Sequence, residues 1–254
     1  MCMKKVAGVL RAITGADHPK NFTSAIIAAA GFSERFGGEQ SKQTTLLCGE
    51  PVLLHTLKAY LDAECIHEII IVARRNEIPE WEALRLRYGL TKPIKIVAGG
   101  HTRQASVMNG LDAVSDKSKY VAIADAARCL TTVDDITAVC RAAYKYKAAT
   151  AAHRSTDTVK IADSKGFIDH TVDRNTVWLA QTPQVFKTKL YRAAAYTAFK
   201  KGFEGTDDNS LVESIGHPIR LVECGTQNIK ITFREDLAVA EAILNERKKW
   251  EAEE

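Results

Sequence analysis

A series of short apolar runs, each followed by a longer stretch of mixed polarity, most constrains what this chain can fold into. The runs are TSAIIAAAG (23–31), HEIIIVA (67–73), IKIVAGG (94–100) and KYVAIAD (119–125). Runs of this length and composition are typical of strands that are buried on both faces of a sheet. The stretches between them, over 51–64, 76–90 and 102–115, have helical spacing. Strands that alternate with helices need crossover connections, so the sequence predicts an α/β fold with a mostly parallel, twisted sheet.

The second half of the chain continues this alternation with one interruption. Residues 157–175, DTVKIADSKGFIDHTVDRN, contain two β-like runs around DSKG, and this pattern predicts a β-hairpin. The hairpin is long and polar, so we expect it to project from the body and to need a partner surface. The other predicted elements are helices over about 132–147, 187–201, 206–214 and 234–250 and strands over 148–154, 217–224 and 228–232.

The organisation of the chain predicts one domain with an arm. The 254 residues contain no internal repeat and no low-complexity linker. We expect a single domain over 23–254, with the hairpin arm at about 154–182. Residues 1–22 contain early lysines and a weak apolar run that is only superficially similar to a signal peptide. We interpret them as an N-terminal extension that is disordered or loosely docked.

Charge, hydropathy and cysteine usage exclude several classes of protein. The 35 basic and 31 acidic residues give a formal charge of +4, which is too small and too dispersed to indicate nucleic-acid binding. No apolar run approaches the roughly 18 residues that a membrane-spanning helix needs. The six cysteines form no C-x-x-C pair, and the seven histidines form no close ligand pair. We therefore predict free thiols in a reducing, cytoplasmic compartment rather than disulfides or a structural zinc site.

Polar and charged residues follow the carboxyl ends of the predicted strands. Because ligands of open parallel sheets bind at these ends, we expect the residues to converge on one site. Taken singly, each has an ordinary structural explanation: a glycine turn, a solvated cation or a helix cap. Together, several cations around one strand-end carboxylate suit a phosphate-rich ligand bridged by Mg²⁺. The group comprises Gly31, Arg35, Lys42, Gly99, Gly100, Arg103, Ser106, Asp125, Arg128 and Lys230.

The loop after the first predicted strand matches neither well-known phosphate motif. In AAAGFSERFGGEQSKQ (28–43), Lys42 does not directly follow a glycine, as a P-loop lysine does. Gly31 is followed two places on by Ser33, which breaks the dinucleotide fingerprint and argues against a dinucleotide oxidoreductase. The sequence also contains no recognisable Ser-His-Asp or Cys-His grouping. We therefore expect direct transfer, stabilised by positioned cations, rather than a covalent intermediate.

A set of motifs resembles one enzyme family along nearly the whole chain, from about Ser24 to Leu244. AAAGFSERFG…SKQ resembles the A-A-G-x-G-x-R-M…P-K-Q loop of 2-C-methyl-D-erythritol 4-phosphate cytidylyltransferases of the non-mevalonate isoprenoid pathway. GGHTRQASV is similar to that family's G-G-x-x-R-x-x-S-V, and ADAARC to its H-D-A-A-R-P. The motifs DTVK, TVDRN, TPQVF, TDDNSLVE and NIKIT follow in the family's order. Each is weak alone, whereas eight in sequence are specific.

For the nucleotide, the resemblance implies a Rossmann-like nucleotidyltransferase fold that binds CTP with Mg²⁺ or another divalent cation. Arg35 and Lys42 would stabilise the transition state at the α-phosphate, and Lys230 would contact phosphates. Asp125 would bind the ribose and the metal. Residues of the two glycine turns would hold the nucleotide: Ala29, Ala30 and Gly31 by their backbone, and Gly100 and Ser106 at the base.

For the second substrate, the resemblance implies methylerythritol phosphate, held with the help of a second copy of the chain. Arg174 would come from the partner subunit, because the projecting hairpin of this family embraces the other protomer. This implies a homodimer with composite active sites. The matching substrate-binding positions are Arg128, Thr158, Arg174, Thr182 and Thr206, together with Lys230.

The chain departs from the family pattern at a few positions, and two alternative functions stay open. Ser41 replaces a proline, Ala124 a histidine, Cys129 a proline and Ser33 a glycine, while the cations and Asp125 are kept. We therefore expect an active enzyme. The alternatives are a ribitol-5-phosphate cytidylyltransferase, against which DTVK and TVDRN argue, and a noncatalytic nucleotide-binding homologue.

Overall fold

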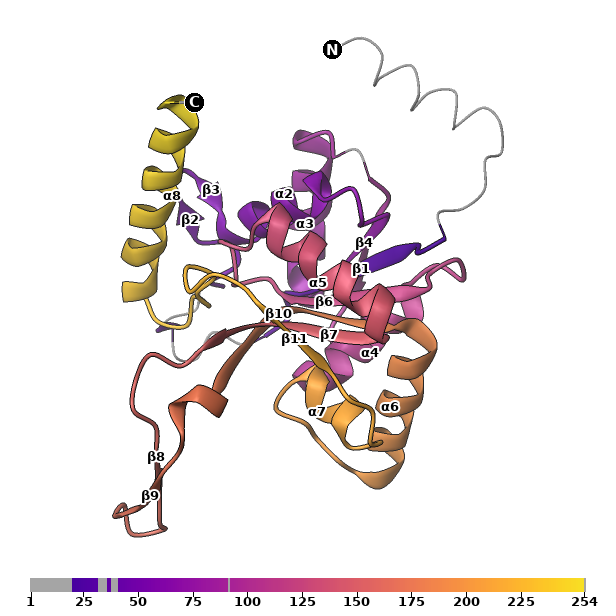
Figure 1. The fold of residues 1–254 in the computed structure, drawn as a ribbon. Coiled ribbons are helices and arrows are strands. Elements are labelled where there is room, and N and C mark those ends of the chain that lie inside the picture. Colours follow the sequence, from indigo (N-terminus) through magenta and orange to yellow (C-terminus); the bar gives the residue numbers. More distant parts are fainter. Residues whose placement is uncertain (1–19, 32–35, 38–40, 91, 254) are drawn as a thin grey trace.

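A computed structural model describes residues 20–31, 36–37, 41–90 and 92–253 of this chain (Figure 1). Within these residues, a seven-stranded sheet has the order β11-β7-β10-β6-β1-β4-β5. All neighbouring strands are parallel except β10, which is antiparallel to both β6 and β7. The strands are β1 (Thr23–Ala28), β4 (Glu68–Ala73), β5 (Ile94–Ala98), β6 (Tyr120–Asp125), β7 (Ala148–Arg154), β10 (Trp178–Lys187) and β11 (Arg220–Glu223). The predicted α/β fold with a mostly parallel sheet is confirmed.

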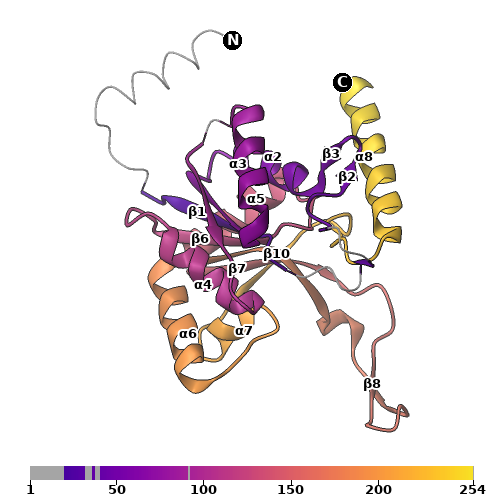
Figure 2. The same cartoon turned by 180° about the vertical axis from the view of Figure 1, so that it is seen from behind.

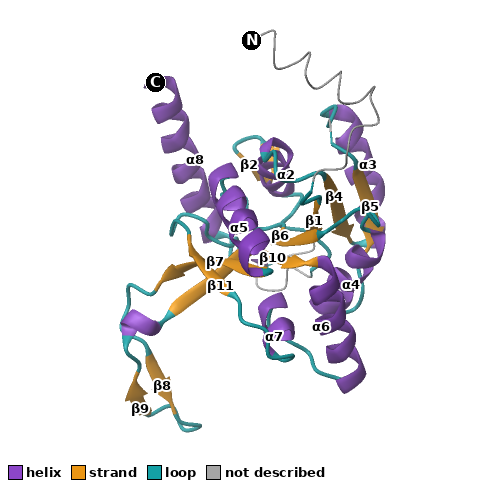
Figure 3. Ribbon diagram, turned by 45° about the vertical axis from the view of Figure 1, so that its right-hand side comes forward, coloured by secondary structure: helices purple, strands orange, loops and turns teal. Residues whose placement is uncertain are grey.

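Helices cover both faces of the sheet, as Figures 2 and 3 show. One face packs against α2 (Val52–Asp62), α3 (Ile78–Arg87) and α5 (Val133–Tyr146), and the other against α4 (Arg103–Ala113), α6 (Thr188–Lys201) and α7 (Asp208–Glu213). Because side chains alternate along a strand, Ile27 of β1 joins the first core and Ile26 joins the second. Both faces of the sheet are therefore buried and shielded from water, which explains why the strand sequences are almost continuously apolar.

The long C-terminal helix α8 (Glu235–Glu253) covers the loops at one end of the sheet rather than a sheet face. A third hydrophobic cluster brings Ala240 of this helix together with Phe36, Leu130 and Ile231. The short ladder of β2 (Leu46–Leu47) and β3 (Glu50–Pro51) lies beside it, and Leu47 belongs to the same cluster. Helix α8 thereby fixes the loops that surround the carboxyl ends of the central strands.

The predicted hairpin is present and projects from the body (Figure 1). Strands β8 (Lys160–Ala162) and β9 (Ile168–Thr171) pair antiparallel, and the helical turn η3 (Arg174–Thr176) leads back to the sheet. In the DSKG turn, Asp163 Oδ1 accepts hydrogen bonds from the backbone N–H groups of Lys165 and Phe167, both at 2.9 Å. Gly166 adopts φ +84°, which a residue with a Cβ rarely adopts. The DSKG turn predicted from the sequence therefore connects the two strands of the hairpin.

Strand β10 was absent from the predicted elements, although it lies in the middle of the sheet. Its sequence, WLAQTPQVFK, contains polar residues and a central proline, which argue against a buried strand. The structure accommodates Pro183 at an irregularity, because the register with β7 shifts between Ala180 and Gln184. The irregular part of β10 faces the loops at the carboxyl end of β6, so it contributes to the site described below.

The predicted strand at 228–232 is wrong. NIKIT alternates as a strand does, but its residues form an extended loop outside the sheet. Ile231 is fully buried and its N–H donates to Ala127 O at 2.9 Å. The alternation therefore reflects packing against the loop that follows β6, not pairing with a neighbouring strand.

Residues 1–19 of the proposed extension lie outside the described residues. Phe22 is already docked: its carbonyl accepts hydrogen bonds from the N–H groups of Lys119 and Tyr120, and its ring stacks on His67 with centroids 4.9 Å apart. In the part of the chain that the structure describes, no helix combines the length and apolar character needed to cross a membrane.

Candidate active site

Two cavities adjoin at the carboxyl ends of the central strands. Their volumes are about 310 and 290 Å³. Arg103, Asp125 and Lys230 line both cavities, and we call these three residues the shared wall. The first cavity is also lined by Ala28, Ala30, Gly31, Lys42, Gln43, Gly100, His101, Thr102, Ser106, Ala126 and Ala127. The second is also lined by Arg128, Ala180, Gln181, Thr182, Gln184, Thr206 and Asp207.

Asp125 is the carboxylate of the shared wall. It ends β6 and is surrounded by three cations: its Oδ2 lies 2.8 Å from Lys230 Nζ and 3.8 Å from Arg128 Nε, and its Oδ1 lies 3.3 Å from Arg103 Nε. Burial alone would raise the pKa of Asp125, but the charges of Arg103, Lys230 and Arg128 outweigh burial and hold this pKa well below its usual range. Asp125 is therefore ionised throughout the neutral range and orients positive charge toward both cavities.

Arg103 connects Asp125 to a second buried carboxylate. It is the first residue of α4, and its Nη1 lies 2.7 Å from Asp208 Oδ2. The helix begins where it does because the Thr102 side chain caps it, accepting a hydrogen bond from Ala105 N at 3.1 Å. Burial lowers the pKa of Arg103, but Asp208 and Asp125 outweigh burial and raise this pKa above its usual value. Arg103 is thus a permanent positive charge, held from two sides.

The turn between β5 and α4 brings the backbone close to the end of β1. A Cβ on Gly99 would lie 2.3 Å from the Ala30 Cβ, and one on Gly100 would lie 2.6 Å from the Ala105 Cβ, so neither position tolerates a side chain. Ser106 Oγ accepts a hydrogen bond from Gly100 N at 3.1 Å and donates one to Thr102 O at 2.9 Å. Gly100 and Ser106 line the first cavity, and Ser106 also holds the turn that shapes it.

The loop that follows β1 is anchored at Gly31. Arg74 Nη2 donates to Gly31 O at 2.7 Å, which fixes the chain as it leaves the sheet. Ala29 is fully buried, and its N–H donates to Val72 O at 2.8 Å. Its amide therefore continues the sheet instead of facing the cavity, whereas Ala30 and Gly31 line the cavity. Arg35 lies outside the described residues.

Lys42 reaches the first cavity from a hydrogen-bonded turn. The Ser41 carbonyl accepts bonds from the N–H groups of Thr44 and Thr45 at 3.1 and 3.2 Å, and Ser41 Oγ donates to Gln43 Oε1 at 2.6 Å. This turn holds Lys42 although Ser41 lacks the fixed φ of a proline. Lys42 Nζ donates to Ile231 O at 3.1 Å, so the lysine also touches the loop that carries Lys230.

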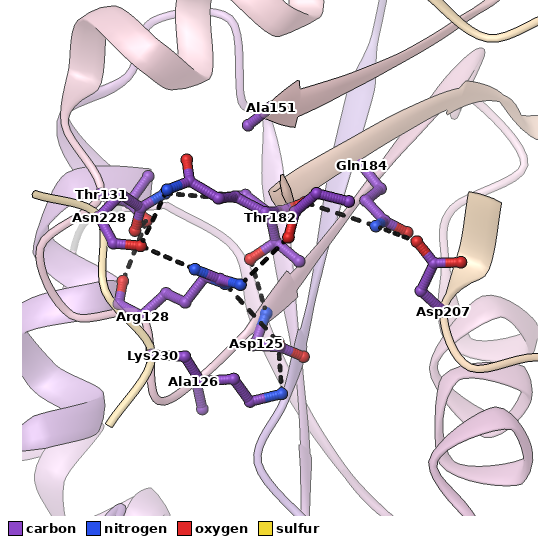
Figure 4. Close-up of polar contacts among 12 residues, drawn as sticks. Asp125, Ala126, Arg128, Thr131, Ala151, Thr182, Gln184, Asp207, Asn228 and Lys230 are labelled. Carbon is purple, nitrogen blue, oxygen red and sulfur yellow. Dashed lines mark hydrogen bonds and ion pairs between the residues drawn. The ribbon is translucent and has the colours of Figure 1, made fainter. Parts of the chain in front are cut away.

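Asn228 fastens the Lys230 loop to the rest of the site (Figure 4). Its Oδ1 accepts from Thr131 Oγ1 at 2.9 Å, its Nδ2 donates to Thr182 O at 3.0 Å, and its carbonyl accepts from Arg128 Nη1 at 2.7 Å. Thr182 Oγ1 in turn accepts from Asp125 N at 3.1 Å. The irregular part of β10, the β6 loop and the Lys230 loop therefore form one hydrogen-bonded unit.

The far side of the second cavity is built by β10 and the start of α7. Gln184 Nε2 donates to Asp207 Oδ2 at 2.8 Å (Figure 4). Asp207 also caps α7, because its Oδ1 accepts from Ser210 N at 2.9 Å. Thr206, which precedes this cap, is exposed and lines the cavity. The TDDNSLVE segment therefore closes the second cavity opposite Arg128.

The structure brings together the predicted residues of the body and separates those of the arm. Arg128, Thr182 and Thr206 line the second cavity, and Lys42 and Lys230 line the first. Thr158 and Arg174 are exposed on the arm and line neither cavity. Arg174 Nη1 instead donates to Thr156 O at 3.2 Å within the arm.

Sequence reasoning missed several residues of the site. Arg103 was among the strand-end cations but was given no role, although its place in GGHTRQ was a usable signal. Asn228, Gln184 and Asp208 were not singled out. Each lies within a family motif, NIKIT, TPQVF or TDDNSLVE, but the motif does not show its partners, because each acts through contacts with segments far away in the sequence.

The side chains around the two cavities offer few ligands for a divalent cation. Among the described residues there is no group of three or more His, Cys, Asp or Glu side chains that could hold a metal ion. Asp125 is the only carboxylate that lines the first cavity in the described part of the chain. One carboxylate fits a Mg²⁺ ion that takes most of its other ligands from phosphate oxygens and water.

Comparison with known proteins identifies relatives over most of the chain. The family model described as 2-C-methyl-D-erythritol 4-phosphate cytidylyltransferase matches residues 23–246. The protein of that name from Caldanaerobacter subterraneus subsp. tengcongensis is 44% identical over 222 residues, which are 87% of this chain and 98% of that protein. The one from Thermosynechococcus vestitus is 39% identical over 226 residues, which are 89% of this chain and 97% of that protein.

Solved structures agree with this similarity. The crystal structure of 4-diphosphocytidyl-2C-methyl-D-erythritol synthase from Anaerococcus prevotii superposes with a TM-score of 0.81 at 33% identity, covering 89% of this chain and 99% of that chain. The 2-C-methyl-D-erythritol 4-phosphate cytidylyltransferase from Thermus thermophilus gives 0.71 at 31% identity, covering 87% and 98%. The likeness therefore extends over the whole length of these relatives.

Proposed function

This chain belongs to the 2-C-methyl-D-erythritol 4-phosphate cytidylyltransferase family, and on that premise we propose how its two cavities are used. The enzyme transfers CMP from CTP to 2-C-methyl-D-erythritol 4-phosphate in isoprenoid precursor biosynthesis. The first cavity takes CTP and the second takes the sugar phosphate. The observation that carries this assignment is the shared wall of Arg103, Asp125 and Lys230, which borders both cavities.

The proposed reaction is a direct in-line displacement. A phosphate oxygen of methylerythritol phosphate attacks the α-phosphorus of CTP and forms the new P–O bond. The bond from the α-phosphorus to the bridging oxygen of the β-phosphate breaks, and its electron pair leaves with pyrophosphate. The product is 4-diphosphocytidyl-2-C-methyl-D-erythritol. No side chain becomes covalently attached, in keeping with the absence of an activated nucleophile from either cavity of the described structure.

Positioned cations perform the catalysis in this proposal. Two anions must approach one another, and negative charge grows on the equatorial oxygens in the transition state. Lys42 faces the first cavity, while Lys230 and Arg103 border both. We assign Arg35 the same task as Lys42. Asp125 keeps Lys230 and Arg103 in place before substrate arrives, so little reorganisation is needed at the moment of reaction.

A divalent cation is part of the proposal. Asp125, at the shared wall, would provide its protein ligand, and the triphosphate would provide most of the others. The metal would neutralise charge on the phosphates and polarise them. The three cations around Asp125 would have to share its oxygens with the metal.

We also propose that the enzyme is a homodimer of the cytoplasm. Thr158 and Arg174 line neither cavity of their own chain, and the arm that carries them extends away from the body (Figure 1). A second copy would use them to complete its sugar-phosphate site. The cytoplasmic location is supported by the cysteines of the described residues, which are free thiols.

Pyrophosphate release tests the proposed function. The full-length protein is incubated with CTP and Mg²⁺, and either methylerythritol phosphate or ribitol 5-phosphate is added. We expect release with methylerythritol phosphate only. Turnover of ribitol 5-phosphate alone would replace the proposed substrate, and CTP binding without release from either sugar phosphate would indicate a noncatalytic homologue.

A further inference from the structure

Asp208 occupies a position that the proposed reaction does not explain. It is the first residue of the short helix α7, and its side chain is 1% exposed. It lies next to Thr206 and Asp207, which line the second cavity, but it lines neither cavity itself. A carboxylate buried to this extent needs partners that offset its desolvation.

Three elements supply those partners. From α6, Tyr191 Oη donates to Asp208 Oδ1 at 2.5 Å, and from α4, Arg103 Nη1 lies 2.7 Å from Asp208 Oδ2. From β10, Gln184 Oε1 accepts hydrogen bonds from the backbone N–H groups of Asp208 and Asn209 at 3.0 and 3.1 Å. Both the backbone and the side chain of Asp208 are therefore fixed.

Tyr191 is itself immobile. It is fully buried, and its ring stacks on that of Phe186 with centroids 5.2 Å apart. Burial and the neighbouring negative charge of Asp208 raise the pKa of Tyr191, so its hydroxyl stays protonated and can donate. The chain of contacts thus runs from a rigid core residue through Asp208 to Arg103.

The guanidinium of Arg103 spans the gap between Asp208 and Asp125. Its Nη1 faces Asp208 and its Nε faces Asp125 Oδ1 at 3.3 Å. With Asp125 as its only acidic partner, Arg103 could swing about that carboxylate and compete with Lys230 for it. A second carboxylate on the opposite side of the planar guanidinium fixes its orientation as well as its position.

We propose that Asp208 is a positioning residue for the transfer reaction: held by Tyr191, it orients the Arg103 guanidinium at the wall that the two cavities share. This inference rests on the proposed function, because it assigns Arg103 to the phosphates that meet there. Asp208 touches no substrate. Its negative charge acts only through Arg103.

The charges on both sides explain why an acid is needed here rather than an amide. Burial raises the pKa of Asp208 above its usual value, although Arg103 and the Tyr191 hydrogen bond oppose this rise; Asp125 adds to it. A guanidinium at 2.7 Å favours the ionised carboxylate. An asparagine would instead direct either a neutral oxygen or an N–H group toward Arg103, and the orientation would be lost.

A double-mutant cycle tests the proposal. We expect Asp208→Asn to lower kcat by about 10- to 100-fold, the scale of a misplaced catalytic group, and to change the KM for each substrate by less than about 3-fold. Arg103→Gln should lower kcat by about 10²- to 10³-fold. In the double variant R103Q/D208N, kcat should equal that of R103Q alone, because Asp208 has no other route to the reaction.

The outcomes separate this role from a structural one. A D208N enzyme with normal kcat, or an additive loss in the double variant, would overturn the proposal. The double variant removes the buried Asp208 charge together with its half-buried Arg103 partner and leaves no unpaired carboxylate at that position, so it should be more stable than R103Q and can be assayed even if R103Q unfolds. If D208N does not fold, Tyr191→Phe keeps the buried ring and removes only the hydrogen bond. Y191F should then lower kcat relative to wild type, and R103Q/Y191F should have the kcat of R103Q alone. A normal kcat in Y191F, or a further loss in the double variant, would overturn the proposal.

A matched control and the wild-type assay complete the design. Glu68→Gln neutralises another buried carboxylate, which accepts bonds from Ser24 Oγ at 2.5 Å and Ser115 N at 2.7 Å at the other end of the sheet. It should lower thermal stability and leave kcat unchanged. If wild-type protein releases no pyrophosphate, the proposed function fails; if wild-type protein is active and D208N matches it, only the role of Asp208 fails.

Discussion

Burial and charge act on Asp125 in opposite directions. Three neighbouring cations hold its pKa well below the usual value of about 4, in spite of burial. Because the pKa is lower in the folded than in the unfolded state, the ionised carboxylate stabilises the fold. This contribution is fully present above the unfolded pKa and is lost as the pH falls through the folded pKa.

The pH dependence of stability checks this assignment. We expect the difference in free energy of unfolding between wild type and Asp125→Asn to be constant between about pH 5 and 8 and to shrink below about pH 4. Urea unfolding at a series of pH values measures it. The same difference at pH 3 and pH 7 would contradict the depressed pKa.

For Lys42 we propose a functional rather than a structural role. It lies in a turn held by the Ser41 carbonyl, and the turn does not depend on the lysine charge. We expect Lys42→Ala to lower kcat by about 10²- to 10³-fold with little change in the free energy of unfolding. Lys58→Ala, which removes an exposed ion pair with Glu50, is the matched control and should keep full activity. A nearly normal rate in K42A would exclude its role at the α-phosphate.

Among the elements, strand β10 and the loop over 228–232 together hold Lys230 at the site. β10 contributes Thr182, whose carbonyl binds Asn228 and whose hydroxyl binds the Asp125 amide. The loop contributes Lys230 and is attached through Asn228 rather than by strand pairing. An irregular strand and an unpaired loop thus position a cation that a regular sheet edge could not place there.

Asn228→Ala tests this attachment. The variant leaves buried partners on Thr131 and Thr182 without their bonds, at a cost of about 1–3 kcal/mol each. We expect a lower melting temperature and a loss of kcat, because Lys230 is no longer fixed. The neighbouring Gln227→Ala removes only an exposed contact with Arg247 and should change neither. Full activity of N228A below its melting temperature would mean that Lys230 is positioned by other contacts.

For the molecule as a whole, the projecting arm is the segment that the proposed homodimer would use. Its tip exposes Phe167 and Ile168, which are 70% and 65% exposed and would be covered in a dimer. Arg174 lies on the same arm, outside both cavities of its own chain. The proposed homodimer gives these observations one explanation, because the second copy would both cover the apolar tip and receive Arg174.

Complementation between two impaired variants tests the composite site. We expect Arg174→Ala to impair use of methylerythritol phosphate more than CTP affinity. When R174A and K42A proteins are mixed and allowed to exchange subunits, each mixed dimer regains one intact site, so about a quarter of wild-type activity should return. No recovery, although sedimentation shows mixed dimers, would mean that Arg174 acts within its own chain.

The sequence predicted the elements whose burial is uniform and the turns whose chemistry is local. The apolar runs ending at Ala28, Ala73 and Asp125 became parallel strands, and DSKG closed a hairpin, because in both cases nearby residues decide the outcome. Lys42 and Arg128 could be gathered into one site because the parallel strands before them end at the same edge of the sheet, whereas Lys230 reaches that site from a loop and not from a strand.

The elements and residues that depend on distant partners could be recognised only in the folded structure. Pro183 made β10 unrecognisable as a strand in the sequence, and the sheet accommodates this proline through a register shift against β7. The alternation in NIKIT reflects burial against the β6 loop. Asn228 and Asp208 look like ordinary polar residues in the sequence, and their roles come from Thr182, Arg103 and Tyr191. The fold class, the family and the charges of the site therefore follow from local sequence patterns, whereas packing between remote segments sets how those charges are held.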